Sequence, residues 1–158
     1  MNENNELQSR YGRIKGIVDV ASLSRKRVTL IGLGSMGQPI SGQLVRHGIA
    51  TRLPGRIRLI DGDIVSARNL IGTEYRLKHL NRPKAVAAYE IIKEIDKDVT
   101  VSYWNRSLKD SDIPHVVEMA NMSDLLGLFA DSFDLMLKIS DRCYDTWPAG
   151  HGSIWPQC

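Results

Sequence analysis

Short apolar runs alternate with amphipathic stretches along the middle of this chain, which is the pattern of a protein that alternates strands and helices. The runs at residues 28–31 and 57–60 are short, rich in Val, Ile and Leu, and closed by glycine or aspartate, which predicts two buried strands. Between them, apolar residues of segment 35–47 recur near helical spacing, and Gly48 is a natural stop. We therefore expect a strand, a helix and a second strand in this order.

The second half of the chain continues the alternation. Asn81 is a suitable helix cap, and Pro83 fits the first turn of the helix that follows. The remaining predicted elements are, in chain order, a helix from Asn81 to about Asp96, a strand over 99–103, helices over 113–119 and 123–129, and a strand over 133–139. The order predicts an α/β fold, a Rossmann-like parallel sheet of about four strands with helices on both faces.

The two ends of the chain read differently from its middle. We expect residues 1–9 to be frayed and residues 11–23 to form a short helix or an ordered arm before the first strand. From residue 144 on, the sequence has no periodicity and is rich in glycine, proline and tryptophan. The sequence thus predicts one nucleotide-binding domain over 1–143 and an irregular tail over 144–158.

Composition narrows the function classes. The chain has 158 residues, of which 42% are hydrophobic and 25% charged, and these values suit one globular domain. The net charge of +3 is too small to argue for nucleic acid, and no apolar run approaches the length of a membrane span. The acidic N-terminus is no signal peptide, and two cysteines make neither a disulfide framework nor a zinc site. We expect a cytoplasmic protein that binds neither nucleic acid nor membrane.

The loop after the first predicted strand contains the first candidate binding residues. Gly32, Gly34 and Gly37 have the spacing of a dinucleotide-binding fingerprint between a strand and a helix. The first permits a tight turn, the second admits phosphates, and the third lets the helix pack close, so that its N-terminus faces an anion. The pattern predicts a nucleotide site, and a tight turn without ligand is the alternative.

Carboxylates follow the second strand. Asp61 stands where an acidic residue commonly accepts hydrogen bonds from ribose hydroxyls. Asp63, two positions on, is either part of the same site or a turn-making or capping residue.

Several segments, taken in order, resemble the ThiF/MoeB group of adenylyltransferases, which is related to ubiquitin-activating enzymes. The matching segments are Arg10–Arg13, Gly32–Gly37, Asp61–Val65 with Asn69 and Leu70, Arg82–Ala85, and Asp134–Leu137 leading to Ser140 and Asp141. The Asp-x-Asp, Asn-Leu and Pro-Lys combination is much more specific than the glycines.

The resemblance implies an ATP-dependent enzyme that activates the C-terminal carboxylate of a ubiquitin-like or sulfur-carrier protein as an acyl-adenylate, releasing pyrophosphate. It implies nucleotide binding by Gly32, Gly34, Gly37, Asp61, Asp63 and Asn69. It further implies that Lys84 neutralises phosphate charge, that Asp141 holds Mg²⁺, and that Arg13 is an arginine finger, in the family often supplied by the other subunit of a dimer.

Each of these roles has a plainer alternative. Lys84 is also compatible with a solvated surface charge, Arg13 with an ion pair to the acidic N-terminus, and Asp141 with a turn cap.

The sequence departs from the family pattern in three ways. Gly72 stands where the family has an arginine, and Arg68 and Arg76 are the candidate replacements, although neither lies at the same spacing. The predicted fourth strand has Lys138 where an acidic residue is common, and the chain is shorter than family members. A short sheet would expose strand edges, which favours a homodimer or a partner chain.

The alternatives to the enzyme are a non-catalytic nucleotide- or partner-binding module and an NAD(P)-binding oxidoreductase domain, whose glycine loop is similar.

Overall fold

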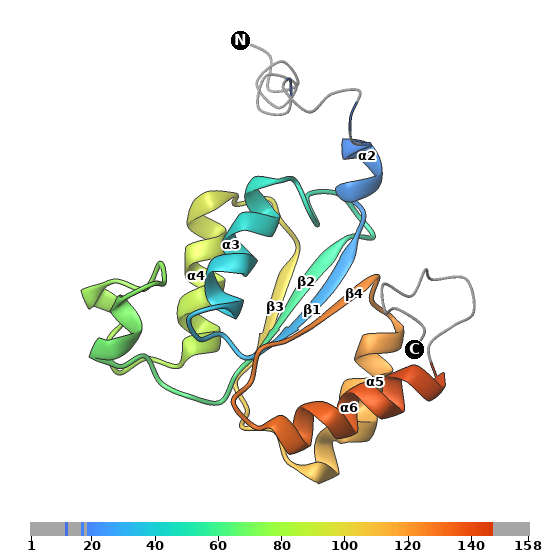
Figure 1. Cartoon of the computed structure of the whole chain (residues 1–158). Coiled ribbons are helices and arrows are strands. Elements are labelled where there is room, and N and C mark those ends of the chain that lie inside the picture. Colours follow the sequence, from blue (N-terminus) through green and yellow to red (C-terminus); the bar gives the residue numbers. More distant parts are fainter. Residues whose placement is uncertain (1–11, 13–16, 18, 147–158) are drawn as a thin grey trace.

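Four parallel strands form one sheet at the centre of the molecule (Figure 1). The computed structural model describes residues 12, 17 and 19–146, so the predictions for residues 1–9 and 147–158, and most of those for 11–18, lie outside the described residues. The strands are β1 (Arg27–Ile31), β2 (Arg56–Ile60), β3 (Val101–Trp104) and β4 (Leu125–Leu128), and their order across the sheet is β3-β2-β1-β4. The predicted parallel α/β sheet with about four strands is confirmed.

Helices cover both faces of the sheet, as predicted (Figure 1). The helices are α2 (Val20–Leu23), α3 (Gly37–Arg46), α4 (Lys84–Ile95), α5 (Ile113–Asn121) and α6 (Phe133–Thr146), with single 3₁₀ turns at Ala67–Leu70, Leu77–His79 and Asp110–Asp112. One face of the sheet carries α3 and α4, and the other carries α5 and α6. None of the helices in the described segment is both long and apolar enough to cross a bilayer.

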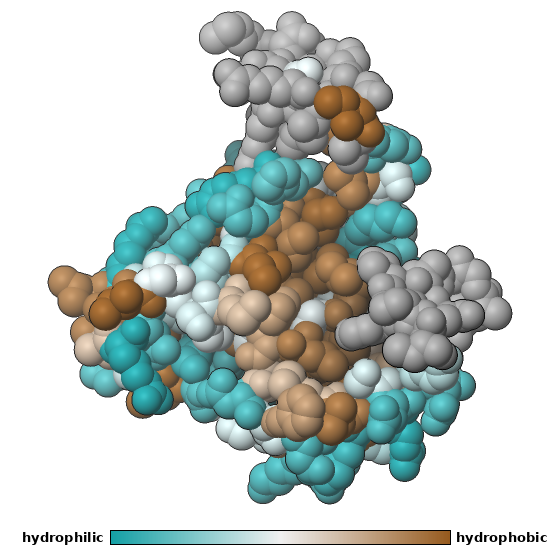
Figure 2. Space-filling model, viewed as in Figure 1, coloured by the Kyte–Doolittle hydropathy of each residue, from teal (hydrophilic) through white to brown (hydrophobic). Residues whose placement is uncertain are grey.

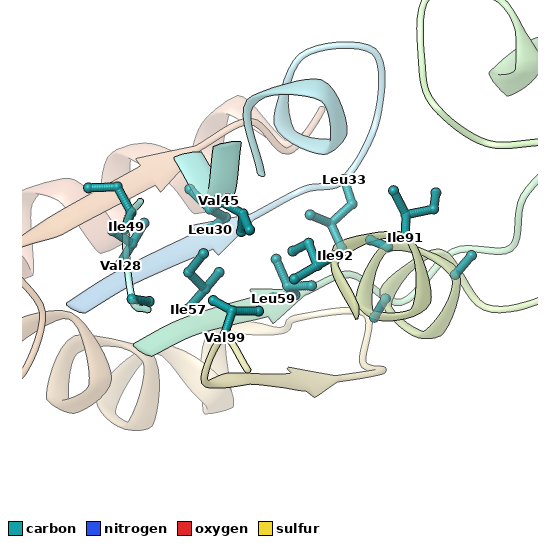
Figure 3. Packing of buried hydrophobic residues seen from close by; sticks show 14 of the residues in the cluster. Val28, Leu30, Leu33, Val45, Ile49, Ile57, Leu59, Ile91, Ile92 and Val99 are labelled. Carbon is teal, nitrogen blue, oxygen red and sulfur yellow. The ribbon is translucent and has the colours of Figure 1, made fainter. Parts of the chain in front are cut away.

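The face under α3 and α4 is a continuous hydrophobic core (Figure 3). Every second residue of β1 and β2 points to it, because strand side chains alternate between faces. The buried side chains at its centre are Val28, Leu30, Ile57, Leu59, Val45, Ile91 and Ile92. Burial of side chains of this kind stabilises the fold by about 1.5–3 kcal/mol each.

The last strand and helix correct two sequence predictions. The expected helix over 123–129 is wrong, because residues 125–128 form the strand β4, and the expected strand over 133–139 is wrong, because it is part of α6. The buried residues of α6, Leu135, Ile139 and Cys143, are spaced by four and so form the apolar stripe of a helix. The β4 run is short and continuous, the pattern of a buried parallel strand, and it contains a glycine, which disfavours a helix.

The observed bounds of α6 also change the interpretation of Lys138 and of residues 144–146. Lys138 lies on α6, where its Nζ contacts carboxylate oxygens of Asp110 at 2.8 Å and Asp134 at 2.7 Å. It is therefore a surface ion-pair residue. Because α6 continues to Thr146, residues 144–146 are helical and do not begin an irregular tail.

The strand β4 forms an edge of the sheet. It pairs with β1, and no other strand of the described segment lies on its far side. Figure 2 shows hydrophobic side chains gathered on the face of the molecule where β4 and α3 lie. An apolar, unpaired edge of this kind suits a further strand or a partner, so the predicted partner chain stays a prediction.

Candidate functional site

The glycine loop joins β1 to α3 at the carboxyl ends of the strands, and two of its glycines are required by the fold itself. Gly32 has φ +88°, and a Cβ there would lie 2.5 Å from the carbonyl carbon of Phe129, just beyond β4. A Cβ on Gly37 would overlap the carbonyl oxygen of Gly32. These two glycines let the loop, β4 and α3 approach one another closely.

The fold itself does not require a glycine at position 34. A Cβ on Gly34 would meet no atom of the described residues within 4 Å, and its backbone does not need the left-handed conformation. The loop therefore keeps open space at this position. Beside it, Met36 gives the N-terminus of α3 no side-chain cap, and the first turn has no acidic residue. Free backbone N–H groups at a helix N-terminus attract anions, so this space suits a phosphate.

Asp61 connects the end of β2 to this loop. One of its carboxylate oxygens accepts a hydrogen bond from the Leu33 N–H at 2.6 Å, and the other accepts from the Asp63 N–H at 2.7 Å. Burial raises the pKa of Asp61 above its usual value, although the two N–H donors and Lys84 oppose that rise. The carboxylate fixes the loop and has further lone pairs for a ligand hydroxyl.

Lys84 is brought to the same place from the start of α4. Its Nζ donates to a carboxylate oxygen of Asp63 at 2.8 Å, and its backbone N–H donates to the Asp63 carbonyl at 2.8 Å. The Lys84 side chain is only 11% exposed, whereas that of Asp63 is 66% exposed. The alternative of a solvated surface charge is therefore wrong for Lys84. A buried ammonium held by one exposed carboxylate is available to a ligand phosphate.

Tyr75 is a site-supporting residue that the sequence reasoning missed. Its side chain is buried, and its hydroxyl donates to the Leu33 carbonyl at 3.0 Å and lies 3.3 Å from the Lys84 carbonyl. Burial raises the pKa of the Tyr75 phenol far above its usual value, so the hydroxyl stays protonated. It ties the glycine loop to α4. No spacing in the sequence signals this contact.

Asn69 and Gly72 border the site on the segment after β2. The side-chain oxygen of Asn69 accepts from the Ser66 N–H at 2.9 Å and from the Ser66 hydroxyl at 2.8 Å, so it shapes a local turn. Gly72 is exposed and has φ +79°. Of the two candidate replacements for the missing arginine, Arg76 pairs with Glu94. Arg68 is exposed on the 3₁₀ turn that contains Asn69.

Asp141 was predicted to hold Mg²⁺ because it was expected to follow a strand directly, and the structure does not place it there. It lies in α6, about 12 Å along the axis from Phe133, where the helix begins. Asp131 is the aspartate that follows the fourth strand. The Phe129 N–H donates to the Ile31 carbonyl at 2.7 Å, and Phe129 and Ala130 lie against Gly32, so Asp131 directly follows the residues that contact the glycine loop. The signal was the apolar run ending in aspartate at 131.

Other expected site features are placed as follows. Arg13 lies outside the described residues. In the described segment no group of three or more His, Cys, Asp or Glu side chains gathers as a metal site. A Mg²⁺ ion bound through nucleotide phosphates needs only one or two protein carboxylates, so this arrangement is compatible with it.

Known proteins resemble this chain over nearly all of its length. A model of the ThiF family matches residues 8–149. The adenylyltransferase and sulfurtransferase UBA4 of Yarrowia lipolytica is 31% identical over 137 residues, which is 84% of this chain and 30% of that protein. The UBA4 of Candida glabrata is 29% identical over 106 residues, which is 63% of this chain and 23% of that protein. The chain thus spans less than a third of the length of these curated relatives.

Solved structures share the fold at lower identity. The E. coli tRNA N6-threonylcarbamoyladenosine dehydratase TcdA, in complex with AMP, matches with a TM-score of 0.76 and 20% identity, over 88% of this chain and 55% of its own. E. coli MccB with MccA-N7isoASN matches with a TM-score of 0.75 and 22% identity, over 88% of this chain and 41% of its own. The family match covers most of the residues, the sheet has the same arrangement, and the chain belongs to the ThiF family.

Proposed function

We propose that this domain binds ATP and takes part in transferring its adenylyl group to a substrate carboxylate. The observation that carries the proposal is the convergence of two loops at the carboxyl ends of β1 and β2. Asp61 holds the glycine loop through the Leu33 N–H, and Gly34 leaves open space between that loop and solvent. Relatives named adenylyltransferases and a related fold solved with ATP support the same nucleotide.

The proposed reaction is an in-line displacement at the α-phosphorus. A carboxylate oxygen of the substrate forms a bond to phosphorus, the bond to the bridging oxygen breaks, and pyrophosphate leaves with its electron pair. Asp61 would accept hydrogen bonds from the ribose hydroxyls, and the side-chain amide of Asn69 would donate to phosphate. Lys84 would exchange its contact with Asp63 for the phosphate charge that develops. Arg13 from a second subunit would add a further cation.

Asp131 replaces Asp141 as the proposed ligand of Mg²⁺. Its carboxylate is exposed and has no hydrogen-bond or ion-pair partner among the described residues. It lies two residues beyond Phe129, beside the glycine loop. A bound Mg²⁺ would neutralise phosphate charge and prefers carboxylate and phosphate oxygens.

The substrate we propose is the C-terminal carboxylate of a ubiquitin-like or sulfur-carrier protein. The proposal that the substrate is such a carrier protein rests on the family alone. Gly72 favours a second function, a non-catalytic module that binds nucleotide or a partner without turnover, because the arginine that the family provides there is missing.

Two matched aspartates give the sharpest test. Asp131→Asn and Asp141→Asn each remove one exposed carboxylate, one beside the glycine loop and one on α6. With a carrier ending in Gly-Gly, we expect exchange of labelled pyrophosphate into ATP to fall about a hundredfold or more in the first variant and to stay unchanged in the second. Equal loss in both, or loss only in Asp141→Asn, would contradict the assignment. ATP affinity in calorimetry without any exchange would favour the non-catalytic module.

A further inference from the structure

The sheet face under α5 and α6 is apolar only near the carboxyl ends of the strands. Ile31 and Ile60 lie there among the hydrophobic residues of the two helices. Nearer the amino ends, the same face carries Arg27, Arg56 and Arg58, because residues two apart in a strand share a face. Three arginines therefore occupy a part of the sheet face that would ordinarily be covered by apolar side chains.

These arginines repel one another. Arg27 and Arg56 are direct register partners in the parallel pair of β1 and β2. Like charges directly opposite one another on neighbouring strands are destabilising. Arg58 follows on the same face, roughly 6.7 Å further along β2. Burial lowers the pKa of Arg58, and the charges of Arg56 and Arg27 lower it further.

Within the described part of the chain, a carboxylate compensates only one of the three. The carboxylate of Asp124 accepts from the Arg27 N–H at 2.8 Å, lies 3.4 Å from Arg27 Nε, and is shared with Lys26 Nζ at 3.6 Å. Among the described residues, neither Arg56 nor Arg58 has a carboxylate at ion-pair distance. The Arg58 side chain makes a long polar contact, from Nη1 to the Ser123 hydroxyl at 3.4 Å.

Arg58 also lines a hollow of about 240 Å³ between α5 and the neighbouring strands β2 and β3. Ser102 from β3 and His115 from α5 contribute polar groups to its wall. Trp104 lines it too, but the His115 ring meets the indole edge-to-face at 5.4 Å, and the Arg106 guanidinium lies 5.5 Å from the indole centroid. The indole thus has contacts already. It offers no free stacking surface of the kind that binds nucleic acid bases.

We propose that Arg56 and Arg58, with the hollow that Arg58 lines, form a docking site for an extended acidic segment of a partner protein. An extended peptide presents alternate side chains roughly 6.7 Å apart, which matches the spacing of the two arginines along β2. Guanidinium groups bind carboxylates through paired, charge-assisted hydrogen bonds. The two arginines lie in the first three residues of β2, whereas the nucleotide loops follow the carboxyl ends of β1 and β2, so the charged part of the site is separate from those loops.

The test uses a fluorescein-labelled peptide, Glu-Ser-Glu-Ser-Glu, and fluorescence anisotropy with the full chain. We expect Arg58→Gln to weaken binding at least tenfold and the double variant Arg56→Gln/Arg58→Gln to abolish it. Arg76→Gln is the matched control, because it removes an exposed arginine that pairs with Glu94 elsewhere. Binding should also weaken as NaCl rises from roughly 50 to 300 mM. Over this range the screening length falls below about 10 Å, so salt weakens the attraction between the arginines and the peptide carboxylates.

Three results would overturn the proposal. One is equal affinity of Arg58→Gln and Arg76→Gln for the peptide, and another is undiminished binding of the Gln-Ser-Gln-Ser-Gln peptide. The third is tighter, Arg58-dependent binding of hexathymidylate than of the acidic peptide, which would assign the surface to nucleic acid. Asp131→Asn should bind the peptide like the unaltered chain, so that failure of the adenylylation proposal does not affect this one.

Discussion

The two faces of the same strands are built on different principles. Under α3 and α4, the residues of β1 and β2 are apolar from end to end, and they line a closed hydrophobic core (Figure 3). Under α5 and α6, Ile31 and Ile60 are buried, while Arg56 and Arg58 lie toward the amino ends. The first face is therefore apolar along both strands, whereas the second face is apolar near the carboxyl ends and charged near the amino ends.

The largest effect should come from the closed face. Leu59 is fully buried at the centre of β2, and Leu59→Ala should lower the free energy of unfolding by about 2–5 kcal/mol, since it removes packed atoms and leaves a cavity. Urea denaturation measures this loss. Arg58→Gln, one residue away on the other face, is the control and should change the free energy by less than about 0.5 kcal/mol. A loss below about 1 kcal/mol for Leu59→Ala would show that the two faces do not differ as described.

A smaller effect tests the polar contacts within the second face. Thr29 is fully buried on β1, and its hydroxyl lies 2.8 Å from that of Ser123, which donates to the Met119 carbonyl at 2.9 Å. Thr29→Val keeps the shape and removes the hydrogen bond, so it should cost about 1 kcal/mol in thermal or urea unfolding. Thr29→Ser keeps the hydroxyl and removes the methyl group. Comparison of the two variants therefore separates the contribution of the hydrogen bond from that of the methyl contacts. Full stability of Thr29→Val would mean that this buried pair contributes nothing.

The short apolar runs closed by glycine and aspartate made β1 and β2 predictable from sequence, and they placed the glycine loop and Asp61 after these strands. The end of the chain was predicted less well, because the run of residues 125–128 is too short to show a period. A parallel strand buried on both faces and a helix segment then look alike. That single error placed Asp141, and not Asp131, directly after the expected fourth strand. Tyr75 could not be found at all, since its contact depends on tertiary packing.

The buried half of the second face can be probed through Cys143. Burial raises the pKa of this thiol to about 11, so at pH 8 almost none of it is thiolate. In a Cys158→Ser background, we expect Ellman's reagent to react with the native protein at least tenfold more slowly than with the urea-unfolded chain. The folded pKa is above the unfolded one, so this group's contribution to stability is present below about pH 9 and lost as pH rises toward 11. Equal reaction rates would contradict burial of the α6 stripe.

The smallest effect concerns the charged half of the second face, and its sign is informative. Arg27 and Arg56 are opposite one another on neighbouring strands, so Arg56→Gln should leave stability unchanged or raise it by a few tenths of a kcal/mol at low salt. Added salt screens the repulsion, so the difference between the variant and the unaltered chain should shrink as NaCl increases. Differential scanning calorimetry at two salt concentrations measures both quantities, with Arg76→Gln as the control that breaks an attractive pair and should lose a little stability. A clear loss of stability in Arg56→Gln would mean that the arginines support the fold, and the reason for placing a partner's carboxylates over them would disappear.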